Sequence, residues 1–121
     1  MEMVRVIAES ETPASPVSGE PIPQADAERI ASVLKALADP NRLQLISLIQ
    51  SSDSHEACVA ELTEPLGLSQ PTVSHHLRIL VEAGVVEREK RGVWAYFRIV
   101  PETMRTVATL LTPPRRRPRR R

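Results

Sequence analysis

The segment from residue 66 to residue 98 constrains the fold of this chain more than any other part of the sequence. Ser69 suits a helix N-cap, because its side chain accepts a backbone N–H, and Pro71 fits the first turn, where its missing donor has no intrahelical partner. Gly84 suits the left-handed residue that follows the end of a helix. The sequence therefore predicts a helix over residues 69–83.

This predicted helix has one apolar side and one polar side. Val73, Leu77 and Leu80 repeat at helical spacing and are expected to face a core. The other side chains are of the kind that read base edges and contact phosphates: Gln70, Thr72, Ser74, His75, His76 and Arg78. Adjacent histidines lie about 100° apart on a helix, so at most one is expected to read bases. The other is as readily a partner in helix packing.

Two short β-prone runs, residues 85–89 and 93–100, follow the helix and predict a charged hairpin, or wing. Gly92 is placed for a positive φ in the turn. In the second run the alternation puts one set of side chains on one face: Val93, Ala95, Phe97 and Ile99. Lys90 and Arg91 are expected to contact phosphate, so the segment resembles a DNA recognition helix with a wing.

Hydrophobic periodicity predicts two helices in the first half of the chain. The first covers residues 25–37, with an apolar face of Ile30, Val33, Leu34 and Leu37. The second is capped by Asp39 and started by Pro40, and its predicted common face is Leu43, Ile46 and Ile49.

A short third helix is predicted from about residue 55 to residue 64, ended by Pro65 and Gly67. A last helix begins at Pro101 and has an apolar stripe of Met104, Val107, Leu110 and Leu111. The predicted fold is thus mainly α with a small β-hairpin, in the order four helices, hairpin, helix.

Composition divides the chain into three parts. Residues 1–24 contain four prolines and no apolar period, so they are predicted to be a disordered arm. Residues 25–112 form one predicted domain, and residues 113–121 a disordered arginine-rich tail. A core this small would bury more surface by pairing with a second copy, which makes a homodimer plausible from size alone.

The net charge of +1 hides an asymmetry, since six of the 16 basic residues lie in the last seven positions. Without them, ten basic residues face 15 acidic ones, a net charge of −5, so any positive face must be local. For the tail we weigh weak, sequence-independent phosphate contacts against a merely solvated segment.

No apolar run approaches the roughly 20 residues that span a bilayer, and the N-terminus is too short and too mixed in charge for a signal peptide. A single cysteine, Cys58, excludes an internal disulfide and fits a reducing cytoplasm. We expect a cytoplasmic protein with no membrane partner.

Three motifs in order, ALADPNRL (residues 36–43), LSQPTVSHHL (68–77) and GVWAY (92–96), closely resemble the ArsR/SmtB family of bacterial transcription regulators. The resemblance covers about residues 25–111. It implies a winged helix-turn-helix dimer on a palindromic DNA operator, usually a repressor that an inducer releases. It also places the first and last helices at the dimer interface, with expected contacts Ile30, Leu34, Met104, Val107, Leu110 and Leu111.

Many relatives in that family sense metals, and the resemblance allows their ligands to be checked here. The Cys-Val-Cys of arsenic, cadmium or lead sensors is Cys58-Val59-Ala60 in this chain, and the arm has no cysteine pair. Zinc and nickel sensors place Asp and His on the last helix, but residues 101–112 contain no histidine. The known family sites are therefore largely missing.

A mixed set of candidates surrounds the third helix: His55, Glu56, Cys58 and Glu61. It suits a borderline divalent metal such as nickel or zinc. The alternative is that Cys58 is a small buried hydrophobe, His55 a cap or surface residue, and the acids a solvated face. If no metal binds, the response would come from a separate sensor protein, from oxidation of Cys58, or from no inducer.

An enzyme is not predicted, because the sequence has no glycine-rich phosphate loop, nucleophile elbow or metalloprotease spacing. A protein-interaction adaptor that has lost DNA binding is a second alternative. Such an adaptor would carry apolar anchors in place of the polar side chains at Gln70, Thr72, Ser74 and Arg78, which are intact.

Overall fold

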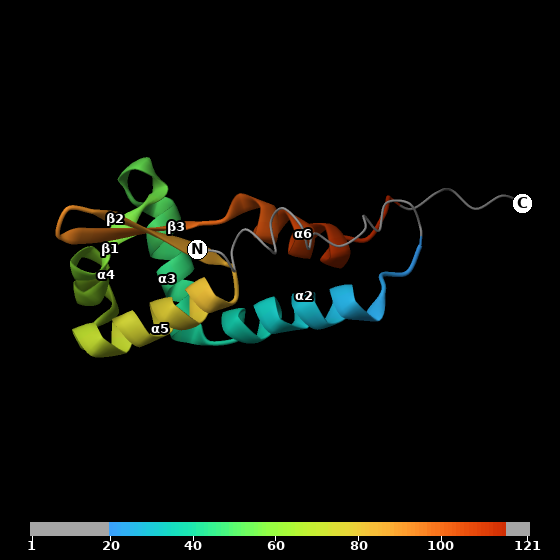
Figure 1. The fold of residues 1–121 in the computed structure, drawn as a ribbon, viewed down its shortest axis with the longest axis horizontal. Coiled ribbons are helices and arrows are strands. Elements are labelled where there is room, and N and C mark those ends of the chain that lie inside the picture. The colour runs from blue at the N-terminus through green and yellow to red at the C-terminus, as the bar shows by residue number, and fades with distance from the viewer. Residues whose placement is uncertain (1–19, 116–121) are drawn as a thin grey trace, which may run out of the picture.

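The computed structural model describes residues 20–115 and arranges them as five helices around a small antiparallel sheet (Figure 1). The elements follow in the order α2 (Gln24–Leu37), α3 (Pro40–Ser51), a 3-10 turn (Asp53–His55), β1 (Ala57–Cys58), α4 (Val59–Leu66), α5 (Gln70–Glu82), β2 (Val86–Arg91), β3 (Trp94–Ile99) and α6 (Pro101–Leu111). This confirms the predicted winged helix-turn-helix. Most of the predicted arm and of the arginine-rich tail lies outside the described residues.

The sheet has the order β1-β3-β2, so β3 is its central strand. Strands β2 and β3 form the hairpin, with Val86 opposite Ile99 at one end and Arg91 opposite Trp94 at the other. Gly92 has a φ of +62° in the turn, as predicted. The side chains alternate between the two faces of this hairpin, which separates neighbouring residues of the wing.

The third helix starts later than predicted. Ser54 and His55 have positive φ in the 3-10 turn, and Ala57 and Cys58 pair with β3 as strand β1, so α4 begins only at Val59. Ala57 and Cys58 pair with residues 40 and 38 positions further along the chain, and no local sequence pattern predicts this pairing. Pro65 lies inside the last turn of α4 rather than after it.

The buried side of α3 also differs from the prediction. Leu45 and Ile49 are 0% exposed and belong to the core, whereas Leu43 is 53% exposed. Ile46 and Leu48 pack partly against the same core. Because apolar residues lie on several sides of this helix, their spacing alone does not select the buried face.

The core gathers side chains from all the helices and from the sheet. Its fully buried members include Leu45, Ile49, Leu62, Val73, Leu77, Leu80, Val85 and Val86. The three apolar residues predicted to seat the helix over 69–83 are thus confirmed as its buried side. They fix which side of α5 remains in solvent.

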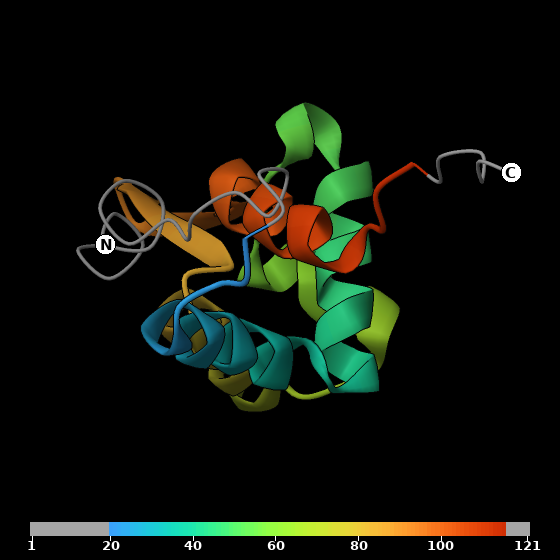
Figure 2. The ribbon, with the colours of Figure 1, turned by 90° about the vertical axis from the view of Figure 1, so that its right-hand side faces the viewer.

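Helices α2 and α6 extend from this body toward the same end of the molecule, which faces the viewer in Figure 2. Ile30 and Val107, two of the expected dimer contacts, are already buried within the chain. Leu34, Met104 and Leu110 are half-buried, and Leu111 is 60% exposed. Among the described residues, no helix has both the length and the apolar character needed to cross a bilayer.

Candidate nucleic-acid interface

Helices α4 and α5 form a helix-turn-helix whose turn is set by local chemistry. Gly67 ends α4 with a φ of +69°, a left-handed conformation that glycine adopts without a Cβ penalty. Ser69 then caps α5, its hydroxyl accepting the backbone N–H of Thr72 at 3.3 Å. Gly84, with a φ of +80°, follows the end of α5 as predicted.

The outer side of α5 is polar and exposed. Gln70, Thr72, Ser74, His75 and Arg78 all lie on it in solvent, as the sequence predicts. Thr72 also exchanges a side-chain hydrogen bond with Ser69 at 2.8 Å, so its hydroxyl partly belongs to the cap. The face offers several hydrogen-bonding groups on one rigid element.

His76 is turned away from that face and toward α3. Its Nδ1 lies 3.2 Å from an Nη of Arg42. Because a guanidinium only donates hydrogen bonds, this nitrogen accepts, and the ring proton belongs on Nε2. Of the two adjacent histidines, His76 is therefore the packing partner and His75 is the exposed one.

Arg42 holds several parts of the helix-turn-helix together. Its Nε donates to the carbonyl of Ala36 at 2.6 Å, and its backbone N–H donates to the Asp39 carboxylate at 3.2 Å. That backbone donor, joined by the N–H of Asn41, keeps the pKa of Asp39 below its ordinary value although partial burial opposes it. The end of α2, the start of α3 and the recognition helix are thereby fixed relative to one another.

The wing sorts its charges by face. Arg88 and Lys90 share one face with Phe97 and Ala95, the residues opposite them in the hairpin register. The other face carries an ion-pair network made of Glu56, Glu87, Glu89, Arg91 and Arg98. The acidic side chains of the wing all belong to this second face, so the charged side chains of the first face, called the basic face below, are all basic.

Arg91 is the centre of that network. It donates to both carboxylate oxygens of Glu56, at 2.6 and 2.7 Å, and to Glu89 at 2.7 Å, and it lies 4.6 Å from the ring centre of Tyr96. The hydrogen bonds from Arg91 lower the pKa values of Glu56 and Glu89, and Glu56 in turn raises the pKa of Arg91. The predicted Lys90 and Arg91 pair is thus divided, with only Lys90 on the basic face.

Arg88 is a basic residue of the predicted positive face that was not among the predicted DNA contacts. It points to the same face as Lys90, which is the face nearer to α5. The signal was available, because a two-residue alternation places positions 88 and 90 together and position 91 opposite. The side chain at the tip, Val93, is 90% exposed in the turn instead of lying on the inner face with Phe97.

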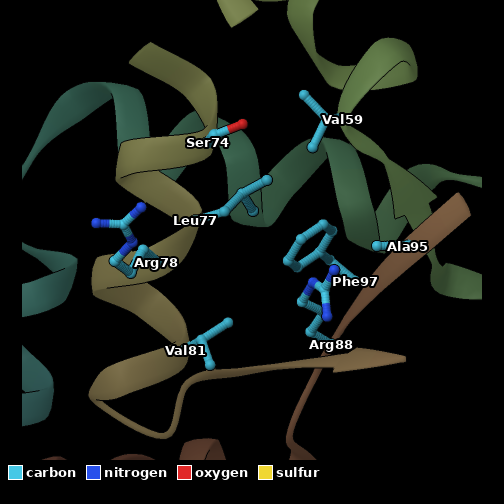
Figure 3. A pocket seen from close by; sticks show the side chains of 8 residues that line it. All are labelled: Val59, Ser74, Leu77, Arg78, Val81, Arg88, Ala95 and Phe97. Atoms are coloured by element: carbon cyan, nitrogen blue, oxygen red, sulfur yellow. The ribbon is translucent and has the colours of Figure 1, made fainter. Parts of the chain in front are cut away.

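A groove of about 320 Å³ separates α5 from the wing (Figure 3). Its apolar lining is Val59, Leu77, Val81, Ala95 and Phe97, and its polar lining is Ser74, Arg78 and Arg88. In Figure 3, Leu77, Val81 and Phe97 point into this space, and the Arg88 guanidinium lies beside the Phe97 ring. The Arg78 guanidinium lies on the outer side of α5.

Three of the metal candidates of the sequence, His55, Glu56 and Glu61, have other partners, and Cys58 is a free, buried cysteine. The Nδ1 of His55 lies 2.7 Å from the carbonyl of Gln50, and Glu61 accepts the backbone N–H of Cys58 at 2.9 Å, which caps α4. Within residues 20–115, no group of three or more His, Cys, Asp or Glu side chains is arranged to hold a metal ion. These residues do not fit a metal centre as they stand.

Comparison with known proteins finds a family and several relatives that share this architecture. Residues 39–88 match the family described as "Bacterial regulatory protein, arsR family". The chain is 37% identical over 84 residues to an HTH-type transcriptional regulator of Methanocaldococcus jannaschii, covering 69% of this chain and 92% of that protein.

The chain is also 43% identical over 79 residues to an arsenic resistance transcriptional regulator of Pseudomonas putida, covering 65% of this chain but 60% of that protein. It therefore spans less than two thirds of that relative's length. Among solved structures, it resembles the homodimeric winged helix-turn-helix DNA-binding domain of a possible ArsR-family regulator from Mycobacterium bovis. The TM-score is 0.62 at 31% identity, covering 72% of this chain and 79% of that one.

Proposed function

Because this chain belongs to the arsR family of bacterial regulatory proteins, which are DNA-binding transcriptional regulators and not enzymes, we propose that it binds a palindromic operator as a homodimer in the cytoplasm. The observation that carries this proposal is the exposed polar side of α5, which lies next to the basic face of the wing. A helix presented in this way fits the major groove of duplex DNA.

Within this proposal, the residues divide into base readers and phosphate contacts. Gln70, Ser74 and His75, with Thr72 as far as its cap allows, offer donors and acceptors to base edges. The phosphate contacts are Arg78 from α5 and the two cations on the basic face of the wing, Arg88 and Lys90. His76 and Arg91 act indirectly, by fixing α5 and the wing.

Dimerisation through α2 and α6 is supported by the apolar side chains that these two helices leave partly or fully exposed. Half-buried Leu34, Met104 and Leu110 and exposed Leu111 give a second copy apolar surface to cover. The Mycobacterium bovis relative is a homodimer. Leu110→Arg should therefore convert the dimer to a monomer in sedimentation velocity and weaken operator binding, because it leaves an unpaired charge in the interface.

We do not propose a metal as the effector. The described residues gather no metal-ligand cluster, and the arsenic resistance named for the Pseudomonas putida relative belongs to that protein. A separate sensor protein stays a hypothesis from the sequence. A pull-down from native extract, with and without added nickel or zinc, tests it, and recovery of the dimer alone would count against it.

The DNA-binding proposal is tested by gel shift on the region upstream of the chain's own gene. Arg78→Glu and Lys90→Glu should each weaken binding strongly while the protein stays folded, because both side chains lie in solvent. Arg105→Glu, an exposed reversal on α6, is the matched control; it should leave the dimer intact in sedimentation velocity and operator binding nearly unchanged. Equal effects of all three variants would contradict the proposed surface.

A further inference from the structure

The groove between α5 and the wing combines two kinds of lining. Leu77 and Phe97, which are almost fully buried, form its floor together with Val59, Val81 and Ala95. Its polar lining is Ser74, Arg78 and Arg88, and among residues 20–115 no acidic side chain lines it. A ligand that fits such a site has an apolar body and a negative charge.

Arg78 and Arg88, the two arginines that line the groove, differ in their pairing from the other arginines of this region. Arg91 and Arg98 are paired with glutamates on the opposite face of the wing, and Arg42 is bonded to His76 and Ala36. Across residues 20–115, neither Arg78 nor Arg88 has an ion-pair partner. The unpaired Arg88 guanidinium beside an apolar floor leaves a local excess of positive charge that an anion would neutralise, and the Arg78 guanidinium on the outer side of α5 adds to it.

Volume and geometry narrow the class of ligand. At about 320 Å³ the groove lies at the small end of ligand pockets. A DNA phosphodiester could meet the arginines but has no apolar group to cover Leu77, Val81 and Phe97. A carboxylate matches the planar guanidinium and accepts two parallel hydrogen bonds from it.

We propose that this groove binds a small organic carboxylate with an apolar ring or short chain, and that the bound acid displaces operator DNA. The carboxylate pairs with Arg88, and the apolar body covers Leu77 and Phe97. Displacement follows because Ser74, Arg78 and Arg88 belong both to this groove and to the DNA surface. The displacement of operator DNA rests on the proposed function, whereas binding of the acid does not.

Binding is tested on the full chain without DNA, by calorimetric titration with naphthalene-2-carboxylate. One saturable site per chain is expected, with at least tenfold weaker binding for Arg88→Gln and for the neutral analogue naphthalene-2-methanol. Acetate, which has the charge without the apolar body, should be at least tenfold weaker as well. Lys35→Gln, a cation outside this groove, is the control and should bind the probe normally.

A cavity-filling variant separates the groove from the rest of the surface. Ala95→Leu places extra volume on the floor and should abolish probe binding while operator binding is retained, since Ala95 shares a face with Lys90 but supplies none of the proposed DNA contacts. If that variant fails to fold by circular dichroism, Val81→Phe fills the same space. Absence of a saturable site, or probe affinity unchanged in Arg88→Gln or in the filled variant, would overturn the proposal.

Competition between the probe and operator DNA tests the proposed displacement. With the probe at about ten times its own dissociation constant, mass action gives a factor of about 11 for each groove, so the apparent operator Kd of a dimer with two grooves should rise about 120-fold. Probe binding without any rise would overturn the displacement and leave the proposed function standing. A chain that binds the probe but no operator fragment would instead refute the proposed function, and with it the displacement.

Discussion

The guanidinium of Arg91 and the carboxylate of Glu56 form a two-pronged ion pair across 35 residues, with hydrogen bonds of 2.6 and 2.7 Å. Glu56 directly precedes β1, and Arg91 ends β2, so the pair ties the wing to the segment between α3 and α4. Such bidentate pairs fix orientation as well as adding attraction. Arg91, which the sequence predicts to contact DNA phosphate, is therefore already paired with Glu56 within the protein.

Lys90 and Arg91 should consequently behave differently on DNA. Lys90→Gln should reduce the log-log salt slope of operator binding by about 1.8, because the dimer loses one phosphate contact from each protomer at about 0.9 per contact. Arg91→Gln should leave the slope nearly unchanged and lower the melting temperature instead, because it breaks the network on the other face. Fluorescence anisotropy at several salt concentrations, with thermal unfolding, measures both. A slope change that is as large for Arg91→Gln as for Lys90→Gln would show that Arg91 leaves Glu56 to reach DNA.

Acid should weaken the same network. The hydrogen bonds from Arg91 lower the folded-state pKa of Glu56 below its ordinary value of 4.5. A carboxyl with a lowered pKa stabilises the fold above its unfolded-state pKa, and this contribution is lost as the pH falls through the folded-state value. Wild type should exceed Glu56→Gln in melting temperature at pH 7, and the difference should shrink below about pH 4.5 as both carboxyl groups of the network, Glu56 and Glu89, take up protons.

Thermal scans of both proteins from pH 7 to pH 3 at one protein concentration provide the measurement. Glu102→Gln, an exposed acid on α6 outside the network, is the control and should follow wild type throughout. A gap between wild type and Glu56→Gln that stays constant down to pH 3 would show that the ion pair adds no stability.

The elements that sequence predicts well here are those set by neighbouring residues. Ser69 and Gly84 mark the ends of the recognition helix because capping and left-handed termination are local events. Gly92 marks the hairpin turn for the same reason. The exposure of the polar side of α5 follows from the buried spacing of Val73 and Leu77.

The features that were missed depend on partners distant in the chain. Strand β1 exists because Ala57 and Cys58 meet the central strand. The partners of Glu56 are distant as well, since it is held by Arg91 and Arg98, which lie 35 and 42 residues further along. Sequence spacing shows which residues share a face of one element, but not which other element faces them.

The two adjacent histidines of α5 should have separable roles. His76→Ala removes the acceptor for Arg42, and a hydrogen bond to a charged group contributes about 2 kcal/mol, so the free energy of unfolding should fall by about that amount. His75→Ala should leave stability within about 0.5 kcal/mol of wild type, because its side chain is exposed, and should change the base preference of operator binding. Urea unfolding and gel shifts on single-base operator variants measure the two effects.

The opposite assignment, with His75→Ala destabilising and His76→Ala altering base preference, would contradict the orientation of α5. In that case Arg42 would need another acceptor, and the sequence-based alternative in which His76 reads bases would stand.

The burial of α3 is tested by two leucines that lie two residues apart. Leu45→Ala should lower the free energy of unfolding by about 2–5 kcal/mol, because it removes a fully buried side chain and leaves a cavity. Leu43→Ala should change it by no more than about 0.5 kcal/mol, since more than half of that side chain is already in water. Urea unfolding at one fixed protein concentration keeps the comparison independent of dimerisation. A larger loss for Leu43→Ala than for Leu45→Ala would restore the face predicted from spacing, and it would rotate α3 against the recognition helix that Arg42 holds in place.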